Sequence, residues 1–513
     1  MAVISGWILI ELLCTVFVIF VGVYIYFRQI LYSYWKKKGV VYLEPTTPTG
    51  NLSSVVRGKI SIGELYADAY AEMKNNRYFG MYAFYKPSLV ITEPDLIKFV
   101  LTKEFTHFHD RGLYCNEEID PLSGHLFLLP GTKWRNLRVK LTPTFTSGKM
   151  KQMFGTVVDC GDKLAQYLKP RAERREVVEL KDLFARFGTD VIMSTAFGIT
   201  CNSLEDPNSE FRHWGRKIFQ PMPIRNALLM FAPKVMDLLS IPFTDKGVTK
   251  FFSTAFKETV EYREANNVTR PDFMNLIMQL MRRGYVDGDN DVTKMLKDMT
   301  DGKITHMEGA AQAYVFFLAG FETTSTTITY CLYELARNQD IQDKVMKDID
   351  NALKKFGGLT YDSIQEMTYL HKVVSETLRK YPPVPILNRV CTKDIDVPTT
   401  NLHVNKGLDI AIPVLGIHMD PEIYPEPDKF DPERFNEANI SSRHPYTYLP
   451  FGEGPRICIG MRFGYSQTKV GLISMLSKYR VRLGPNTPVP LELDPGNIVM
   501  TAKGGIELLI ELR

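Results

Sequence analysis

The most informative stretch of the chain is Phe451-Gly452-Glu453-Gly454-Pro455-Arg456-Ile457-Cys458-Ile459-Gly460. Its glycines and its proline favour a compact loop, and a helical pattern follows directly, so Cys458 lies just before a helix N-terminus. There the helix dipole and free backbone N–H groups favour a thiolate, which binds soft metals. A cysteine nucleophile would need an adjoining base, and the nearest upstream histidine is His444. Pro455 also interrupts any dinucleotide-binding pattern, so the loop predicts metal ligation by Cys458.

The composition predicts one large folded body. The chain has 513 residues, 45% of them hydrophobic and 23% charged, and no Gly/Ser- or Pro-rich linker divides it after residue 50. Its 62 basic and 58 acidic residues leave a net charge of +4, which gives no broad field for nucleic acid. The seven cysteines are scattered without a Cys-x-x-Cys pair, which excludes a disulfide framework and a zinc or dithiol motif.

The first 27 residues form a segment that can cross a membrane. Glu11 is its only charged side chain, and about 20 apolar residues are enough to span the hydrocarbon core. Arg28 and the run Lys36–Lys38 follow while nothing basic precedes, so we expect a luminal N-terminus and a cytosolic body. A cleaved signal peptide fits less well, because it would begin with basic residues and have a shorter apolar run. The expected organisation is an anchor at 1–27, a basic, proline-containing hinge at 28–50 and a body at 51–513.

Helical patterns dominate the body, and the strand-type patterns are short. Two extended pieces, Tyr82–Tyr85 and Leu89–Ile91, are separated by Pro87. The tail predicts a hairpin of Ile498–Ala502 with Ile506–Leu512 around two glycines. The expected fold is therefore mainly α with small β-sheets, preceded by one transmembrane helix.

A long helix is predicted from the capping box Thr305-His306-Met307-Glu308 towards Asn338. It is apolar nearly all round, as buried core helices are. Gly320, Glu322 and the run Thr323-Thr324-Ser325-Thr326-Thr327 are unfavourable in such a helix. An adjacent acid and alcohol could pass protons to a ligand bound beside Gly320. A plain core helix remains the alternative from these residues alone.

A third pattern is Glu376-Thr377-Leu378-Arg379, which precedes the helix-ending Tyr381-Pro382-Pro383. The i,i+3 spacing places its acid and its base on one helix face. By itself this spacing is typical of an exposed salt bridge, which contributes little to stability. Its significance comes from the other two motifs.

Together these motifs resemble the cytochrome P-450 family. The resemblance rests on the loop around Cys458, on Ala319-Gly320-Phe321-Glu322-Thr323-Thr324, on Glu376-x-x-Arg379 and on Pro432-Glu433-Arg434-Phe435, in the family's order and spacing. It covers the whole chain, including the microsomal anchor. The flanking residues Pro143-Thr144-Phe145-Thr146-Ser147-Gly148-Lys149 and Asn388-Arg389-Val390 resemble the branch of insect detoxification and vertebrate drug-metabolising enzymes, with the insect members more similar.

The resemblance implies a role for each matching residue. Cys458 would be the thiolate ligand of haem iron, and thiolate donation promotes O–O cleavage. Glu322 and Thr323 match the pair that delivers protons to dioxygen, for which Ala319 and Gly320 leave room. The positions that pack haem or hold its propionates are Trp134, Arg138, Arg389, Phe451 and Arg456. A buried structural triad would comprise Glu376, Arg379 and Arg434. The substrate-pocket positions are Phe108, Phe127, Phe316, Val384, Ile386 and Val499.

The resemblance also implies a reaction and its partners. The protein would be a haem-thiolate monooxygenase of the endoplasmic reticulum membrane that uses haem b, O2 and NADPH-derived electrons to oxygenate hydrophobic xenobiotics such as plant toxins, insecticides or drugs. Because the chain carries no nucleotide-binding motif, an NADPH-dependent flavoprotein reductase would supply the electrons, with cytochrome b5 as a further candidate donor. On the helix-like stretch Thr132–Leu141, Arg138 is assigned to haem, and Lys133, Arg135 and Lys140 would face solvent to dock the acidic reductase.

Three alternatives stay open at this point. The substrate could instead be an endogenous sterol, fatty acid or hormone. An isomerase or dehydratase of the same fold would leave Glu322 and Thr323 unexplained, and a membrane-anchored carrier of hydrophobic ligands would make Cys458 ordinary core.

The residues 227–242, rich in Leu, Met and Phe, could be core or a loop that enters the bilayer beside the substrate entrance.

Overall fold

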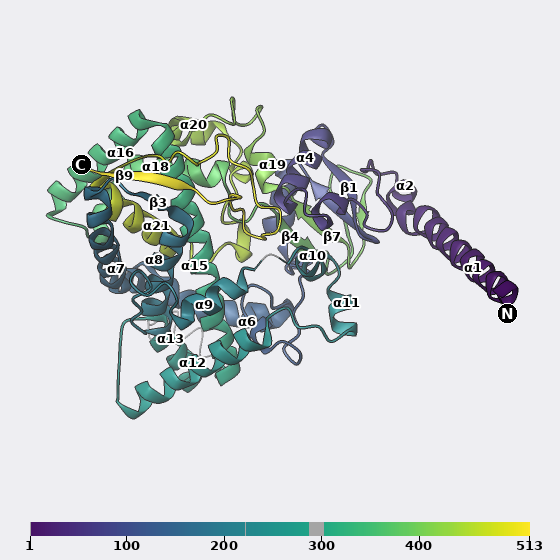
Figure 1. Ribbon diagram of the computed structural model, residues 1–513, viewed down its shortest axis with the longest axis horizontal. Helices are drawn as coiled ribbons and strands as arrows, with labels where there is room; N and C mark the ends of the chain where they lie inside the picture. The colour runs from purple at the N-terminus through teal and green to yellow at the C-terminus, as the bar shows by residue number, and fades with distance from the viewer. Residues whose placement is uncertain (1, 221, 287–301) are drawn as a thin grey trace.

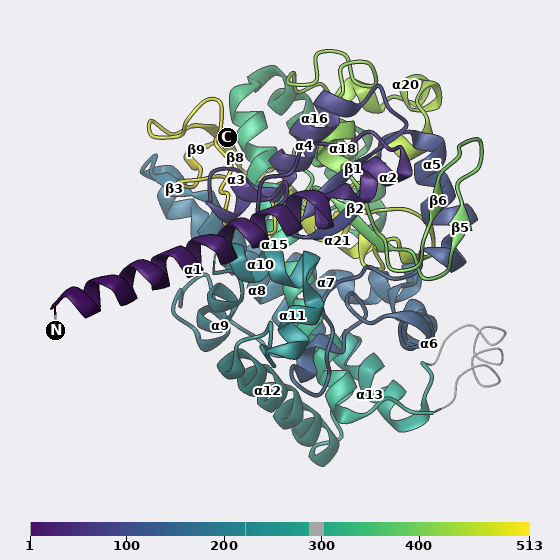
Figure 2. The ribbon, with the colours of Figure 1, turned by 90° about the vertical axis from the view of Figure 1, so that its right-hand side faces the viewer.

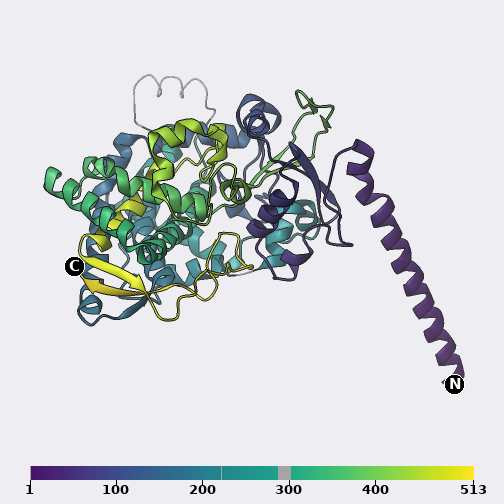
Figure 3. The ribbon, with the colours of Figure 1, turned by 90° about the horizontal axis from the view of Figure 1, so that it is seen from above.

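The computed structural model describes residues 2–220, 222–286 and 302–513. Helices make up most of it and the strands form small sheets, so the predicted fold class is confirmed. Figures 1 and 3 show the N-terminal helix α1 leaving the body on the side of one sheet, with the C-terminus and a second sheet on the opposite side.

The helix α1 runs from Ala2 to Gln29 and is followed by η1 (Leu31–Ser33) and α2 (Tyr34–Lys38). Residues 7–38 are long and apolar enough to cross a membrane, and the most apolar part of them packs against nothing in the body. This agrees with the predicted transmembrane helix.

The residues after α1 pack against the body rather than hanging free. Trp35 is fully buried, and its indole Nε1 donates to the carbonyl of Met81 at 2.9 Å. A Cβ at Gly80 would lie 2.4 Å from the Trp35 ring, so the strand can approach the indole only because residue 80 is glycine. Much of the stretch predicted as a hinge is therefore fixed to the first sheet.

The first sheet has the strand order β1-β2-β7-β4, with β1 (Tyr78–Ala83), β2 (Lys86–Ile91), β7 (Asp409–Ile412) and β4 (Leu387–Val390). The predicted piece Tyr82–Tyr85 is shifted, since Tyr82 and Ala83 end β1, and Phe84 and Tyr85 form the turn. The predicted piece Leu89–Ile91 is present in a longer strand, β2, that includes Pro87. Proline is tolerated there because β7 pairs with β2 only from Ser88 to Val90, so no ladder partner needs its missing N–H.

The second sheet contradicts the predicted C-terminal hairpin. Its order is β3-β9-β8, with β3 (Val177–Glu179), β9 (Glu507–Leu512) and β8 (Tyr479–Leu483). β9 pairs with these two strands, whereas Ala502 forms only an isolated bridge with Leu493. The stretch 498–502 is held elsewhere, because the N–H of Met500 donates to the carbonyl of Pro383 at 3.2 Å. The third sheet pairs β5 (Ile395–Asp396) with β6 (His403–Val404).

The long helix α15 (His306–Arg337) forms the centre of the main hydrophobic core, and its predicted capping box is present. It packs against α8 (Leu180–Ile192), α12 (Lys246–Ala265) and α21 (Met461–Leu476). The longer remaining helices are α4 (Ile62–Met73), α6 (Gly131–Leu141), α7 (Ser147–Glu173), α9 (Glu210–Ile218), α10 (Pro223–Phe231), α13 (Phe273–Arg283), α16 (Gln339–Phe356) and α18 (Thr368–Lys380). The shorter ones are α3 (Ser53–Val56), α5 (Pro94–Lys98), α11 (Pro233–Leu238), α17 (Tyr361–Glu366), α19 (Val414–His418) and α20 (Glu437–Ser442).

Candidate functional site

The loop that carries Cys458 is shaped by glycines. Gly454 has φ +75°, and a Cβ there would lie 2.0 Å from the carbonyl oxygen of Leu101, so only glycine fits. The short helix η9 (Gly454–Arg456) follows, and the N–H of Cys458 donates to the carbonyl of Phe451 at 2.9 Å. This bond closes the loop just before α21 begins at Met461.

Cys458 lies deep in the protein, yet its side chain has accessible surface, as a residue has when it faces an internal void. Burial raises the pKa of the thiol, whereas the backbone N–H of Gly460 and the cations Arg138 and Arg111 lower it. A bound cation would add to the lowering effects and favour the thiolate. Among the residues that the structure describes, no cluster of three or more His, Cys, Asp or Glu could hold a metal ion instead.

Near Cys458 lies a cluster of buried or partly buried arginines, which comprises Arg111, Arg138, Arg389 and Arg456. Arg389 is 1% exposed and Arg456 3% exposed. Burial lowers the pKa of Arg456 to about 9 and that of Arg111 to about 10. Burial also lowers the pKa of Arg389, and the neighbouring Arg111 and Arg456 lower it further.

This cluster lacks counter-charge. Asp110 is the one carboxylate within ion-pair distance of it in the described parts of the chain, 3.6 Å from Arg456. The Nε atoms of Arg111, Arg389 and Arg456 have no hydrogen-bond partner among the described residues. Each of these three guanidinium groups donates to a backbone carbonyl, but the remaining N–H groups and the excess positive charge are unfavourable when buried. The arrangement therefore fits an anionic group that the chain itself does not supply. The two propionates of haem have that charge and the carboxylate shape that guanidinium groups bind.

Trp134 completes this wall of the site. It is 5% exposed, and the guanidinium of Arg456 stacks over its ring at 4.2 Å. Sequence reasoning missed Arg111, whose guanidinium lies over the ring of Phe127 at 4.2 Å. A signal was present, because Arg111 is the one Lys or Arg in the stretch 108–128.

The predicted acid–alcohol pair lies on α15. Glu322 is buried, with its carboxylate 3.7 Å from the ammonium of Lys181 on α8. Burial raises the pKa of Glu322, and the cations Lys181 and Arg212 oppose this rise. The hydroxyl of Thr323 donates to the carbonyl of Ala319 at 2.5 Å. Ala319 is exposed although the helix around it is buried, as expected for a residue that faces an internal space.

The structure shows a packing reason for glycine at position 320. A Cβ at this position would lie 2.3 Å from the Cδ1 of Ile192, at the end of α8. The glycine thus permits close contact between α15 and the C-terminal end of α8. The predicted role of Ala319 and Gly320 in leaving room for dioxygen stays a prediction.

The Glu376–Arg379 pair is not a surface salt bridge. Both side chains are fully buried, and Arg379 forms two hydrogen bonds with the carboxylate at 2.7 and 2.9 Å. Arg434 on η7 (Pro432–Phe435) lies 3.4 Å from the same carboxylate. The N–H of Asp431 also donates to it at 3.0 Å. Glu376 therefore joins α18 to the segment that leads to the Cys458 loop.

The structure separates the six predicted pocket residues. Phe108 is 1% exposed and packs on Phe99 at a ring distance of 6.2 Å, in the core beside the first sheet. Ile386 is also buried, in a third core cluster. Phe316 packs on Phe145 and Phe273. Phe108 and Ile386 are thus buried in hydrophobic cores, whereas Phe316 is half-buried against the main core. Their assignment to a substrate pocket stays a prediction.

The other pocket candidates keep accessible surface. Phe127 is 40% exposed and Val384 36% exposed. Val499 is half-buried in a segment that hydrogen-bonds the residue before Val384. These residues remain candidates because the stretches that carry them lie beside Arg111 or beside each other.

The basic cluster on α6 is smaller than predicted. Lys140 does not face solvent: it is 7% exposed, and its ammonium donates to the carbonyl of Gly302 at 2.6 Å. Lys133 is exposed and pairs with Glu117 at 2.6 Å, and Arg135 is exposed. Two of the three expected solvent-facing cations therefore remain.

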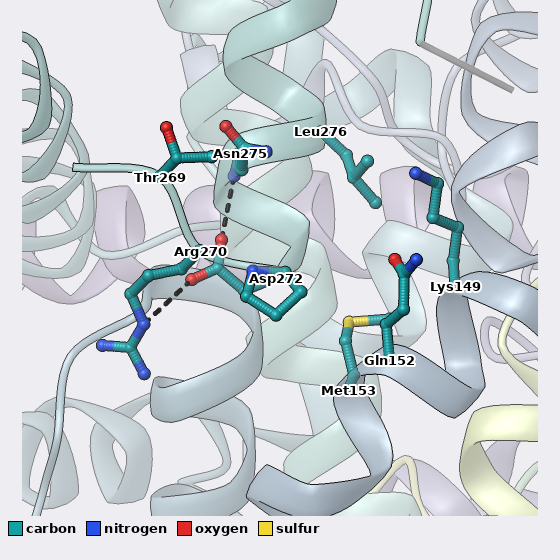
Figure 4. Close-up of a pocket in the computed structure, with 9 residues that line it drawn as sticks. Lys149, Gln152, Met153, Thr269, Arg270, Asp272, Asn275 and Leu276 are labelled. Atoms are coloured by element: carbon teal, nitrogen blue, oxygen red, sulfur yellow. Dashed lines mark hydrogen bonds and ion pairs between the residues drawn. The ribbon is translucent and has the colours of Figure 1, made fainter. Parts of the chain in front are cut away.

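A separate hollow of about 300 Å³ lies between α7 and α13 (Figure 4). Lys149 and Gln152 stand on one side of it, and Arg270 pairs with Asp272 on the other at 3.6 Å. None of the predicted site residues lines it. It is therefore distinct from the site at Cys458.

Comparison with known proteins agrees with this geometry. A family model described as cytochrome P450 matches residues 59–509. Cytochrome P450 6k1 of Blattella germanica is 42% identical over 517 residues, which cover 99% of this chain and 98% of that protein. Probable cytochrome P450 6a14 of Drosophila melanogaster is 43% identical over 94% of this chain and 96% of its own length. Cytochrome P450 6A1 of Musca domestica is 40% identical over 95% of both chains.

The site and these matches define a haem-thiolate oxidoreductase of the monooxygenase class. The chain belongs to the cytochrome P450 family, and the relatives named above are insect members. The family uses haem b with a cysteine thiolate ligand, together with O2 and NADPH-derived electrons.

Proposed function

We propose that this protein is a membrane-anchored monooxygenase that oxygenates hydrophobic xenobiotics, with Cys458 as the thiolate ligand of its haem. The observation that carries the proposal is the cluster of Arg111, Arg389 and Arg456, which is buried, short of counter-charge and close to Cys458. Few other groups besides a haem with two carboxylates would match such a site.

Each residue of the site has a separate task. Haem, once bound, supplies the oxygen chemistry. Arg138 and the buried arginines hold its propionates, and Trp134 and Phe451 pack against it. Glu322 takes up and releases protons between Lys181 and the interior, while the hydroxyl of Thr323 orients the last donor. Ala319 leaves space beside that hydroxyl.

The substrates we propose are lipophilic foreign compounds. Phe127, Val384 and Val499 offer apolar surface, and the Arg111 guanidinium over Phe127 is assigned to haem, which favours selection of substrates by shape. A panel of xenobiotics, sterols, fatty acids and hormones, scored by spectral shift and product formation, tests this proposal. Strict selectivity for one hormone would overturn it in favour of an endogenous hydroxylase.

We place the anchor at 1–27 in the endoplasmic reticulum membrane, with a luminal N-terminus and a cytosolic body. The α10–α11 segment also faces the side from which α1 leaves (Figure 2). There Ile224 is 61%, Leu238 83% and Leu239 59% exposed, more than is usual for large apolar side chains. Within 227–242, Leu229 and Met236 are buried in a small core cluster, and we assign the exposed end at Leu238 and Leu239 to contact with the membrane.

The spectrum of the reduced, carbon-monoxide-bound protein tests the ligand. We expect the red-shifted Soret band of a thiolate-ligated haem in the wild type, and its loss in Cys458→Ala and Cys458→His. A thiolate spectrum that survives either substitution would exclude Cys458. A protein without haem would instead favour the carrier function.

Thr323→Ala tests the proton-delivery assignment. Haem and substrate should still bind, but reducing equivalents should leak to peroxide because proton delivery is misdirected. The measurement is product formed per NADPH consumed. An unchanged ratio would reduce Thr323 to a helix residue.

An NADPH-dependent flavoprotein reductase is the proposed electron donor, and cytochrome b5 is a second candidate. Lys133→Glu combined with Arg135→Glu should slow reductase-supported turnover, more at low than at high salt. Peroxide-supported turnover, which needs no partner, should stay near wild type. Equal losses in both assays would show damage to the haem site and remove the docking assignment.

A further inference from the structure

One turn of α15 has an unusual supply of hydrogen-bond donors. The hydroxyl of Thr323 donates to the carbonyl of Ala319. Ser325 has one hydroxyl proton, which the carbonyls of Phe321 and Glu322 share at 2.8 and 3.0 Å, and Thr327 donates to the carbonyl of Thr323 at 2.8 Å. Each of these donors lies one turn further along the same helix.

The carbonyl of Gly320 accepts its side-chain hydrogen bond from a different helix. Its side-chain donor is the amide Nε2 of Gln467 at 3.3 Å, and Gln467 belongs to α21, the helix that follows the Cys458 loop. Each carbonyl from 319 to 323 is therefore within hydrogen-bond distance of a side-chain donor, with Ser325 shared by two of them. The donor to position 320 comes from another helix.

Such donors lower the free energy that is needed to open the helix locally. In an α-helix the carbonyl of Gly320 also accepts the N–H of Thr324. When that ladder bond breaks in a buried segment, the carbonyl becomes an unsatisfied polar group unless a second donor remains. Gln467 is such a donor, so the carbonyl of Gly320 keeps a partner when its ladder bond breaks.

The side-chain oxygen of Gln467 argues against a purely structural role for this residue. Gln467 is fully buried, and its Oε1 has no hydrogen-bond partner in the described parts of the chain. A leucine or methionine would fill a similar volume without leaving a buried acceptor unpaired. Unsatisfied groups of this kind are expected where function rather than stability decides the residue.

We propose that Gln467 is a positioning residue that keeps the Ala319–Thr323 turn of α15 able to open beside the acid–alcohol pair. Its donor stabilises the open turn more than the closed turn, because only the open turn depends on it. The inference rests on the proposed roles of Glu322 and Thr323, and it adds a link from the helix of the Cys458 loop to the proton-delivery side.

The test is amide hydrogen exchange of the haem-loaded, full-length protein in detergent, read at peptides that cover residues 316–328. In Gln467→Leu we expect exchange at Thr324 to slow about fivefold, the factor that one lost hydrogen bond gives. The thermal midpoint should stay unchanged or rise, because the unpaired acceptor is removed. Faster exchange with a lower midpoint would show a structural brace and overturn the proposal.

Turnover supplies a second readout. Product per NADPH should fall in Gln467→Leu while the thiolate spectrum remains, since the amide does not touch the iron ligand. Gln467→Met repeats both measurements should the leucine variant fail to fold. An unchanged product ratio together with unchanged exchange in both variants would also overturn the proposal, and the retained spectrum would leave the proposed function intact.

The matched control is Gln342→Leu. Gln342 is equally buried, but its amide joins the end of α15 to β8, donating to the carbonyls of Leu335 and Val481 at 2.9 and 3.0 Å. Its Oε1 accepts the N–H of Val481 at 2.9 Å, so both ends of the amide are satisfied. This variant should lose stability without a change in exchange at 324 or in product ratio. The same slowing of exchange there would show a general effect of losing a buried amide and would refute the specific role of Gln467.

Discussion

Arg111 shows how a single residue can favour one state of the protein and disfavour another. Its guanidinium is buried among other cations, so it destabilises the haem-free chain. Once an anion is bound, the same charge becomes a donor to it. Arginine at this position thus destabilises the haem-free protein and stabilises the haem-bound protein.

We therefore expect opposite effects of Arg111→Gln in the two states. The haem-free protein should unfold at a higher denaturant concentration, while haem loss to an acceptor protein should become about tenfold faster, the factor for one charge-assisted hydrogen bond. Arg135→Gln, on the exposed face of α6, is the control and should change neither. A slower haem loss from Arg111→Gln would contradict the assignment.

Glu322 gives a pH-dependent prediction. Burial raises its pKa in the folded protein above the unfolded value, so the fold prefers the protonated acid. Its contribution to stability is then largest at low pH and is lost as the pH rises through the folded pKa. At neutral pH Glu322→Gln should stabilise the fold, by about 1 kcal/mol for a buried charge with a distant partner, and slow turnover. Thermal midpoints at pH 5 and 7.5 should differ less in the variant; an equal difference would refute a raised pKa.

At the scale of elements, Glu376 joins α18, η7 and the residues before the Cys458 loop. Glu376→Gln would leave Arg379 and Arg434 buried without their carboxylate. We expect a loss of about 3–5 kcal/mol in the free energy of unfolding, as for other broken buried pairs. Glu366→Gln, whose pair with Lys355 is about half exposed, should change it by less than about 1 kcal/mol. Denaturant unfolding of the haem-loaded protein measures both, and similar small losses would show that the triad is dispensable.

The elements also show how far sequence reasoning reaches. The capping box at Thr305 and the i,i+3 pair at Glu376 are local patterns, and both were predictable. The strand Glu507–Leu512 was also predictable, but its partners were not, because β8 and β3 are distant in sequence. The burial of Lys140 depends on the carbonyl of Gly302, and the link of Gln467 to Gly320 depends on the contact of α21 with α15. Such contacts carry no signal within either segment.

At the scale of the whole molecule, the structure predicts different outcomes for two deletions that remove the anchor. Deleting residues 1–28 should leave the body folded, because α1 packs little against it. Deleting 1–50 also removes Trp35 and should expose the hollow that its ring fills against Gly80. We expect the shorter deletion to give a soluble domain with native haem content, and the longer one to unfold at clearly lower denaturant.

Trp35→Ala in the protein that lacks only residues 1–28 isolates the cause. Loss of a fully buried tryptophan should cost about 3–5 kcal/mol, by analogy with other large-to-small core substitutions. Trp7→Ala, in the exposed part of α1, is the control in the full-length protein and should leave the body's stability unchanged. An unaffected midpoint in Trp35→Ala would mean that the segment is a free hinge after all.

The seat of Trp35 on β1 has a consequence for encounters within the bilayer. A catalytic domain on a flexible linker would rotate freely above the bilayer. Many encounters with a partner in the same membrane would then occur in an orientation that does not allow binding. A body held at its first sheet keeps one angle to its anchor, so the search between the two proteins becomes lateral diffusion plus rotation about a single axis. Lengthening the stretch between Lys38 and Gly50 by flexible residues would restore tumbling and lower the encounter rate without altering the haem site.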